Sequence, residues 1–416
     1  MRKERSIALT MLCAVSMSTV ALAQEFVQIE PLDGDDWIRV RGISADGSVA
    51  AGTSYAGSWA NGRAIMWTPE TGTVALASDG NNSYVADMSA DGTTIIGGVS
   101  GLGNAVRWVN GVMEVLPVQP GVSDFGVIAV NGDGSVIVGE ALYEGEFTAV
   151  KWTSEGVSGF DGIKRGAYSF ATAVSEDGNV ITGLSEFDAA EGFRWTAATG
   201  LEWLGFLPGG SWHSTIVSMS ADGSVMGGQS HVSPDNFAAA IWSQSAGWTE
   251  IPSIIPSSSF ANAIQSISGD GSIMVGYNTG SSPSAWATIM YDQANGVRLL
   301  QDALEQDYDI DFGDWDISGN NPFGTNVANV GVSSDGKTFY GSTYHPQTGA
   351  EASWIAYTEP VCVASDLNCD GSVDVLDLLI LLGDWGACPD SACPSDLNGD
   401  GTVDVLDLLT LLGNWG

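Results

Sequence analysis

The stretch Ser44-Ala-Asp-Gly-Ser-Val-Ala-Ala-Gly52 introduces a pattern that returns six more times in this chain of 416 residues. Each copy combines a Ser/Asn-x-Asp-Gly turn with a short apolar segment that ends in glycine, as in Ser135-Val-Ile-Val-Gly139. The turn aspartates are Asp46, Asp91, Asp133, Asp177, Asp222, Asp270 and Asp335, separated by 45, 42, 44, 45, 48 and 65 residues. Such a period indicates a repeated supersecondary unit.

The repeats contain four candidate strands each, apart from the last, which lacks the fourth. One lies before the turn, one follows it, a third carries an aromatic residue, and a fourth follows a glycine-containing turn, as at 112–117. The aromatic residues of the third strands are Trp67, Trp108, Trp152, Trp195, Trp242, Tyr291 and Trp354. Four strands in roughly 40 to 50 residues are the signature of a propeller blade. The sequence therefore predicts a mainly β fold, a seven-bladed β-propeller of four-stranded blades over residues 24–360.

The two ends of this region complement each other. The seventh repeat stops after its third strand, at 354–358, whereas residues 26–32 look like an isolated fourth strand. We expect residues 26–32 to complete the last blade, which would close the ring and remove an exposed sheet edge. The longer last interval contains residues 299–306, for which we expect a short helix.

The Asp-Gly turns are interpreted as hairpin turns, because each offers a single aspartate and a cation loop needs several oxygens. The third-strand aromatic residues should pack between blades. Aromatic residues outside that register could stack on sugar faces where solvent reaches them, and otherwise belong to the packing. They are Trp59, Trp203, Trp212, Trp248, Trp286, Trp315, Tyr55, Tyr84 and Tyr168.

The repeats resemble the HAF family of extracellular repeats. The resemblance lies in the Ser-x-Asp-Gly-Ser-x-x-x-Gly core, in the Ala-x-x-Trp strand that follows it, and in the longer last interval. It implies a repeat architecture and an extracellular setting, and it implies no activity.

The first 23 residues have the features of a secretory signal peptide. Arg2, Lys3 and Arg5 precede an apolar run at 7–22, and Ala21-Leu22-Ala23 offers a cleavage site. We therefore predict a secreted, extracellular protein. No later stretch reaches the roughly 20 apolar residues of a membrane span. A formal net charge of -37 argues against nucleic acid as a partner.

The C-terminal region contains one segment twice, and each copy has the spacing of a twelve-residue calcium loop. Oxygen-bearing residues occupy the first, third, fifth, seventh, ninth and twelfth places, with glycine in the sixth. The expected ligands are Asp366, Asn368, Asp370, Ser372 (carbonyl), Asp374 and Asp377 in the first loop, and Asp396, Asn398, Asp400, Thr402 (carbonyl), Asp404 and Asp407 in the second. Residues 361–416 contain no lysine or arginine, so we predict two calcium ions and folding coupled to their binding. A pair of Asx-rich turns is the simpler alternative.

The segments around these loops indicate the type of module. Pro360, Pro389 and Pro394 argue against a helix that enters either loop, whereas 375–382 and 405–412 read as short leucine-rich helices that leave them. A loop followed by an exiting helix, twice, resembles a type I dockerin. The resemblance implies a small α-helical calcium-binding domain at 361–416 that attaches a secreted protein to a cohesin.

This module departs from the dockerin pattern at the tenth and eleventh loop places, which are apolar here, and it has no basic residue late in its helices. We therefore expect a cohesin-like or another extracellular protein as the partner, bound through an apolar face. That face would consist of Val375, Leu376, Leu379, Val405, Leu406 and Leu409. The alternative is that the leucines only pack the two helices together.

Four cysteines lie in this module, namely Cys362, Cys369, Cys388 and Cys393. An even, clustered set in an oxidising compartment indicates two disulfides. Three pairings satisfy the count, and the sequence does not choose among them. A zinc site is a weaker alternative, because the spacing lacks a paired C-x2-C pattern.

The sequence offers little for catalysis. It has no nucleophile elbow, zinc-binding helix or phosphate loop, and His213, His231 and His345 fall in different repeats. The leading hypothesis is a non-enzymatic propeller that serves as a recognition or scaffold module, with carbohydrate as a candidate ligand, anchored through the dockerin-like domain. The alternatives are a carbohydrate-active hydrolase or lyase and a calcium-stabilised tail without a partner.

Overall fold

The computed structural model describes residues 25–102, 105–118, 122–143, 145–160, 163, 168–186, 188–233, 236–255, 262–280, 286–318, 329–359, 365–368, 373–388 and 393–415. The expected signal peptide lies outside these residues. The chain divides into a β-rich unit, Gln24–Glu359, and a small unit, Pro360–Gly416.

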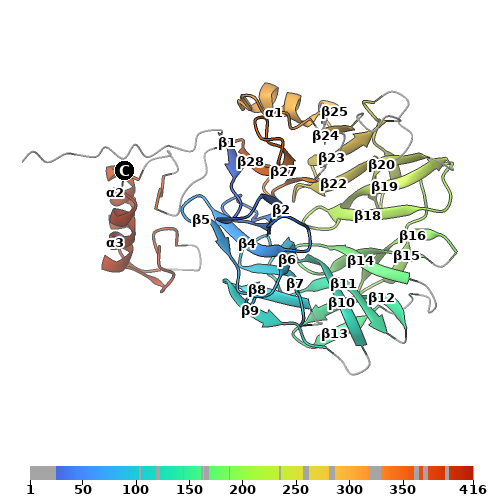
Figure 1. The fold of residues 1–416 in the computed structure, drawn as a ribbon, viewed down its shortest axis with the longest axis horizontal. Coiled ribbons are helices and arrows are strands. Elements are labelled where there is room, and N and C mark those ends of the chain that lie inside the picture. Colours follow the sequence, from blue (N-terminus) through green and yellow to red (C-terminus); the bar gives the residue numbers. More distant parts are fainter. Residues whose placement is uncertain are drawn as a thin grey trace, which may run out of the picture. The chain divides into compact units, whose positions relative to one another are not determined.

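Within the described residues, the β-rich unit forms seven antiparallel four-stranded sheets, which follow one another around a centre in chain order (Figure 1). It is a seven-bladed β-propeller, as the repeats predict. The first three blades contain β2 (Trp37–Ile43), β3 (Ala50–Tyr55), β4 (Gly62–Thr68) and β5 (Gly72–Ala75); β6 (Ser83–Met88), β7 (Thr94–Val99), β8 (Ala105–Val109) and β9 (Val112–Val115); and β10 (Val122–Val130), β11 (Ile137–Tyr143), β12 (Glu146–Thr153) and β13 (Gly156–Gly159). The next three contain β14 (Tyr168–Val174), β15 (Val180–Glu186), β16 (Ala190–Thr196) and β17 (Gly200–Trp203); β18 (Ser214–Met219), β19 (Val225–Ser233), β20 (Asn236–Ser243) and β21 (Gly247–Glu250); and β22 (Ala263–Ile267), β23 (Ile273–Thr279), β24 (Trp286–Asp292) and β25 (Gly296–Leu299).

The seventh blade draws its strands from both ends of the unit. It contains β26 (Asn329–Val332), β27 (Thr338–Tyr344), β28 (Glu351–Tyr357) and, on its outer edge, β1 (Glu25–Ile29). The strand β1 runs antiparallel to β28, with Glu25 opposite Tyr357 and Ile29 opposite Ser353. The N-terminal strand thus covers an edge that β28 would otherwise expose.

Each Ser/Asn-x-Asp-Gly turn is held by the side chains of its own first and third residues. In the sixth blade, Asp270 Oδ1 accepts hydrogen bonds from the Ser268 hydroxyl at 2.7 Å and from the Ser272 N–H at 2.9 Å. The Ser268 hydroxyl oxygen in turn accepts the N–H of Ile273 at 3.0 Å. The hydrogen bond from Ser268, and to a smaller extent those from Ser272, hold the pKa of Asp270 below its ordinary value. The predicted structural role of the turns is confirmed.

The turns also join the blades to one another through backbone hydrogen bonds. The second residue of one turn, or the aspartate that follows it, donates its N–H to the carbonyl oxygen of the second residue in another blade's turn. The last of these bonds returns to the first blade, so the series forms a closed ring. The bonds are Ala45 to Ala90, Asp91 to Gly132, Gly132 to Glu176, Glu176 to Ala221, Ala221 to Gly269, Gly269 to Ser334 and Asp335 to Ala45, at 2.7–3.2 Å. Glu176 is the one large side chain at the second place of these turns. Its carboxylate accepts a hydrogen bond from the Ser334 hydroxyl of the seventh blade.

Within the described residues, the innermost strand carries a β-bulge in six of the blades. The bulged residue lies three residues before the first residue of the turn. The bulge brings that strand very close to the second strand of its blade. A Cβ atom on Gly276 would lie 2.0 Å from the Ala263 carbonyl oxygen, and one on Gly139 would lie 2.0 Å from that of Gly126. The glycine that ends each repeated motif is therefore required because no side chain fits there.

The core of the propeller is a series of clusters between neighbouring blades. In one of them, the fully buried Trp108 packs with residues of its own blade and with Ala51 and Ala64 of the preceding blade. Its indole Nε1 donates a hydrogen bond to the Ala77 carbonyl oxygen at 2.7 Å. The third-strand aromatic residues thus pack between blades, as their register predicts.

The predicted helix in the last interval is α1 (Leu300–Tyr308). Its buried face consists of Leu300, Ala303 and Leu304, which join the cluster between the sixth and seventh blades. The helix therefore covers this cluster.

The small unit contains two helices, α2 (Val375–Gly383) and α3 (Val405–Gly413), and a short pairing of β29 (Gly386–Ala387) with β30 (Thr402–Val403). Both helices occupy the ranges predicted from the leucine pattern. Its buried core consists of Val373, Leu381, Val403 and Leu411. Among all helices of the described residues, none is long and apolar enough to cross a membrane.

Candidate calcium loops and binding surfaces

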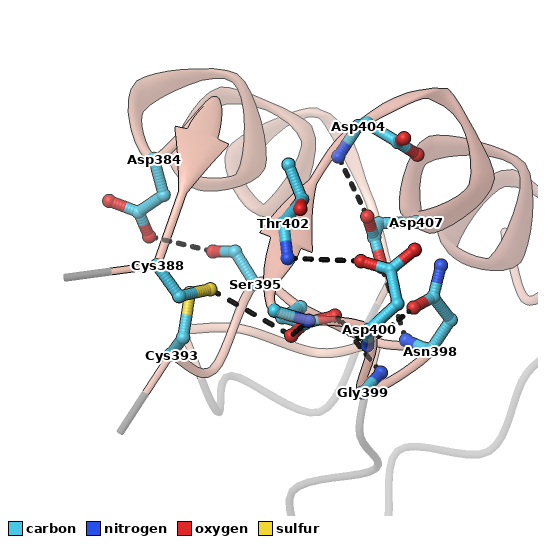
Figure 2. Close-up of a disulfide and its surroundings, with 12 residues drawn as sticks. Asp384, Cys388, Cys393, Ser395, Asn398, Gly399, Asp400, Thr402, Asp404 and Asp407 are labelled. Carbon is cyan, nitrogen blue, oxygen red and sulfur yellow. Dashed lines mark hydrogen bonds between the residues drawn. A yellow bond between two sulfur atoms is a disulfide. The ribbon is translucent and has the colours of Figure 1, made fainter. Parts of the chain in front are cut away.

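The second predicted calcium loop, residues 396–407, folds around its own side-chain oxygens. The Asp396 carboxylate accepts hydrogen bonds from the three successive N–H groups of residues 399–401, at 2.7–3.1 Å. Asn398 Oδ1 accepts the N–H of Asp400 at 2.9 Å, and Asp400 Oδ1 accepts that of Thr402 at 3.0 Å. Figure 2 shows the labelled side chains of this loop beside the start of α3.

The ninth and twelfth residues of the loop, Asp404 and Asp407, form a capping box at the start of α3. Asp404 Oδ1 accepts the N–H of Leu406, and Asp407 Oδ2 accepts the N–H of Asp404, both at 2.7 Å. The second oxygen of Asp407 accepts the N–H of Asn398 at 3.1 Å. Asp407 is fully buried and thus ties the helix to the beginning of the loop.

The first loop repeats this geometry where it is described. Asp377 is fully buried and accepts the N–H groups of Asn368 and Asp374 at 3.1 and 2.7 Å, the same distances as in the second loop. Asp366 is also buried. The expected ligands Asp370 and Ser372 lie outside the described residues.

The donor atoms fit calcium in two respects. They are all oxygens, which calcium prefers, and the buried carboxylates of Asp377 and Asp407 have no lysine or arginine in residues 361–416 to balance their charge. On the other hand, in the described part of the chain no three Asp, Glu, His or Cys side chains lie close enough to form a metal-binding group. The capping boxes also give the ninth and twelfth aspartates a role that needs no cation. The calcium sites therefore stay a prediction.

The predicted partner-binding residues lie on the exposed sides of α2 and α3. Val375, Leu376, Leu379, Val405, Leu406 and Leu409 are all exposed, and Leu379 and Leu409 are each 59% exposed. Leu381 and Leu411 lie two residues further along each helix than Leu379 and Leu409, so they face the opposite side and fill the core instead. This exposure argues against the alternative that the leucines only pack the two helices together, and partner binding through the six residues stays a prediction.

The structure joins Cys388 to Cys393 in a disulfide, drawn in Figure 2. The sequence left three pairings open. Cys362 and Cys369 lie outside the described residues. The bonded pair bridges the segment between β29 and the second loop, so it restrains the entry to that loop.

The aromatic residues outside the blade register divide into packed and exposed ones. Trp248 is buried and donates its Nε1 hydrogen to the Leu204 carbonyl at 2.9 Å, and Tyr55 is buried too. Trp286 stacks on Tyr277, and Trp315 packs on Phe26. The exposed ones are Trp59, Tyr84, Tyr168, Trp203 and Trp212. This last group is the best exposed for stacking on a ligand.

The interpretation that the three histidines fall in different repeats is wrong for two of them. His213 directly precedes β18 and His231 lies in β19, so the antiparallel pairing of these two strands brings their rings to 6.2 Å. Both rings contact Phe237, and that of His231 also lies 4.0 Å from Trp212. Burial, and then the neighbouring His231, lower the pKa of His213. This is an aromatic cluster in which a neutral imidazole is favoured.

A cavity of about 570 Å3 lies at the centre of the propeller, where the innermost strand of each of the seven blades contributes to its wall. The bulged residues of these strands line it. At this place, three residues before the turn, the repeats carry Arg41, Ala86, Ile128, Thr172, Val217, Gln265 and Val330. Arg41 is the one charged residue in this set. The sequence interpretation missed it, although an alignment of the repeats on their turns would have found it.

Comparison with known proteins identifies the fold and no family. No family model and no curated protein matches the chain. An oligogalacturonate lyase from Vibrio parahaemolyticus matches at 14% identity and a TM-score of 0.53, over 80% of this chain and 93% of that one. An oligogalacturonate lyase in complex with manganese matches at 14% identity and a TM-score of 0.52, over 76% and 88%.

TolB from Acinetobacter baumannii matches at 14% identity and a TM-score of 0.42, over 61% of this chain and 60% of its own, which is less than two thirds of its length. At identities this low, the comparisons establish the propeller fold alone.

Proposed function

We propose that this chain is a secreted calcium-binding protein, in which the propeller is a recognition or scaffold module and residues 361–416 form a dockerin-like anchor to an extracellular protein. The observation that carries the proposal is a pairing that occurs twice. An oxygen-rich loop leads directly into a helix whose exposed side is apolar, at Leu379 and again at Leu409.

The apolar sides of α2 and α3 support the anchoring role. Clusters of exposed, large apolar side chains often mark interaction surfaces, whereas single exposed apolar residues are common on any protein. The capping boxes connect each loop to its helix, since Asp377 and Asp407 contact both. Bound calcium would neutralise the loop carboxylates, so that the position of each helix would depend on the cation.

Calorimetric titration of the chain from residue 24 onwards with calcium tests the calcium-binding part of the proposal. We expect two ions per chain and a loss of one ion in Asp407→Ala, because that carboxylate is the twelfth ligand of the second loop. Asp79→Asn is the control, since Asp79 lies in the propeller and asparagine tolerates its positive φ of 51°. No uptake at up to about 1 mM calcium, the weak end for extracellular modules, would refute it.

The second half is tested by immobilising the same chain and exposing it to the secreted and cell-surface proteins of its source. We expect a partner that is retained in calcium, is released by chelator, and is lost in the double variant Leu379→Lys, Leu409→Lys. Val112→Lys, at an exposed valine of the propeller, is the matched control. Calcium uptake with no such partner would instead favour a structural calcium-stabilised tail, and cleavage of a polysaccharide would favour the enzyme hypothesis.

A further inference from the structure

We propose that the central cavity of the propeller binds a small polyhydroxylated carboxylic acid, such as a uronic acid, and that the Arg41 guanidinium holds its carboxylate. The inference rests on the recognition role proposed for the propeller and is independent of the calcium loops.

Arg41 is placed in the cavity by the fold. It is the extra residue of the bulge in β2, between Val40 and Gly42 in the pairing with β3, and it lines the cavity with an exposed side chain. Its carbonyl oxygen accepts a hydrogen bond from the Tyr340 hydroxyl at 3.2 Å, which fixes the backbone from the seventh blade. A bulge re-aims a side chain in this way next to many binding sites.

Arg41 differs from the other described cations because its guanidinium has no hydrogen-bond or ion-pair partner in the described part of the chain. Lys151 lies over the Trp195 ring at 4.0 Å. The other described cations are ion-paired, as Arg39 with Glu351, Arg63 with Asp35, Arg107 with Glu114, Arg194 with Glu202, Arg298 with Asp292 and Lys337 with Glu359. In a chain with 50 acidic residues, a cation kept apart from carboxylates is available to a carboxylate from outside.

Two carboxylates in the surroundings of Arg41, those of Glu351 and Asp87, do not replace such a ligand. Glu351, whose charge reaches Arg41, is already bound by Arg39 at 2.6 Å. Asp87 lines the same cavity, but burial raises its pKa to about 7, so its charge opposes an anion only in part at neutral pH. Its Oδ2 also accepts the Val130 N–H at 3.0 Å. A guanidinium with free donors can grip a carboxylate with two parallel hydrogen bonds.

The remaining wall of the cavity suits the hydroxyl groups of a sugar. Amide and hydroxyl side chains line it at Gln229, Thr172 and Thr215. Gln229 Oε1 is buried and lacks a hydrogen-bond partner within the described residues, and a buried acceptor of this kind favours a ligand that donates to it. Phe170 and Tyr277 add apolar ring surface. The volume lies in the range of pockets that hold small organic molecules.

The test is calorimetric titration of the chain from residue 24 onwards with glucuronate and galacturonate, and with glucose and galactose as counterparts that lack only the carboxylate. We expect a uronate to bind at least about tenfold more tightly than its neutral counterpart, and Arg41→Gln to lose about the same factor, because a hydrogen-bonded charge pair is removed. Arg107→Gln is the matched control, since Arg107 pairs with Glu114 on the propeller surface and should leave binding unchanged.

Thermal unfolding of Arg41→Gln is measured alongside, and we expect it to match the unaltered protein because the guanidinium has no hydrogen bond or ion pair to lose within the described residues. If that variant is unstable, the preference of the unaltered chain for uronate over the neutral sugar decides alone. No uronate binding, equal binding of the neutral sugar, or unchanged binding in a folded Arg41→Gln would each overturn the proposal. None of these outcomes affects the calcium or partner experiments, so failure of the two proposals can be told apart.

Discussion

The side chain of Asp87 links two blades from the wall of the central cavity. Its Oδ2 accepts the Val130 N–H of the third blade, and serines at the corresponding place of the fifth and sixth blades do the same. Ser218 accepts the N–H of Ile267 and Ser266 that of Val332, both at 3.1 Å. One of these links therefore carries a titratable group where the others carry a hydroxyl.

This difference predicts a pH dependence of stability. Burial raises the pKa of Asp87 from 3.8 to about 7, so the folded state binds a proton that the unfolded state has released. Folding stability should therefore fall as the pH rises from about 4 to about 7 and stay level above that. In Asp87→Asn, which keeps an acceptor for Val130, we expect the contribution of Asp87 to this slope to disappear, a change of a few kcal/mol at most. Urea unfolding at steps between about pH 5 and 8 measures it.

The turn aspartates do not obscure this effect. Hydrogen bonds lower the pKa of Asp177 and Asp270, so their stabilisation is lost only below about pH 4, as the carboxylates take up protons. Asp79→Asn should retain the slope of the unaltered protein. An unchanged slope in Asp87→Asn would contradict the prediction.

At the scale of residues, the sequence predicts what is repeated and misses what depends on the partner strand. The role of Asp270 follows from its turn motif. The exposure of Leu379 follows from helix periodicity only after the core is known, and the proximity of His213 and His231 requires the register between β18 and β19. The pairing of Cys388 with Cys393 needs the path of the chain between β29 and β30.

At the scale of elements, the close approach of the bulged first strand to the second strand can be tested at one glycine. In Gly276→Ala the new Cβ would meet the Ala263 carbonyl oxygen at 2.0 Å, a contact that requires the backbone to move. We expect the free energy of unfolding to fall by about 3 kcal/mol, measured by urea denaturation.

The matched change is Gly159→Ala in β13, where the nearest atom, the Ala149 carbonyl oxygen, would lie at an ordinary 3.7 Å. That variant should unfold within about 0.5 kcal/mol of the unaltered protein. Equal effects at the two glycines would show that the bulge leaves more room than the structure indicates.

Most elements were predictable because their signals are local. The repeated turn marks the end of the first strand and the start of the second, and the leucine spacing marks α2 and α3. The calcium loops show the limit of such signals. A residue such as Asp404 has the same sequence position whether it binds a cation or caps a helix, so the pattern alone does not separate the two roles.

At the scale of the whole molecule, the ring depends on the strand β1. Phe26 packs on Phe312, Trp315 and Trp354 with ring centroids 5.0, 5.3 and 6.1 Å away. Removal of residues 24–30 should expose both this cluster and the edge of β28. We expect a lower unfolding temperature and concentration-dependent association, which light scattering during thermal unfolding would detect.

Phe26→Ala separates the two effects, because it reduces the packing and keeps the strand. It should lower the unfolding temperature without association. A truncated chain that remains monomeric would show that β28 needs no cover.

The number of blades follows from the number of repeats, and the source of the last strand follows from the incomplete seventh repeat. The closed series of hydrogen bonds among the turns could not be predicted in the same way. It depends on how far each blade is rotated from the next, and that angle is set by the packing of residues such as Trp108 between blades.

The pairing of β1 with β28 has a consequence for the order of events during synthesis. More than three hundred residues separate β1 from its partner β28 along the chain. During synthesis, the other blades can therefore form before the ring is closed. A chain that is released early lacks β28 and cannot dock its own beginning. Closure of the seventh blade therefore requires a chain that extends at least through β28.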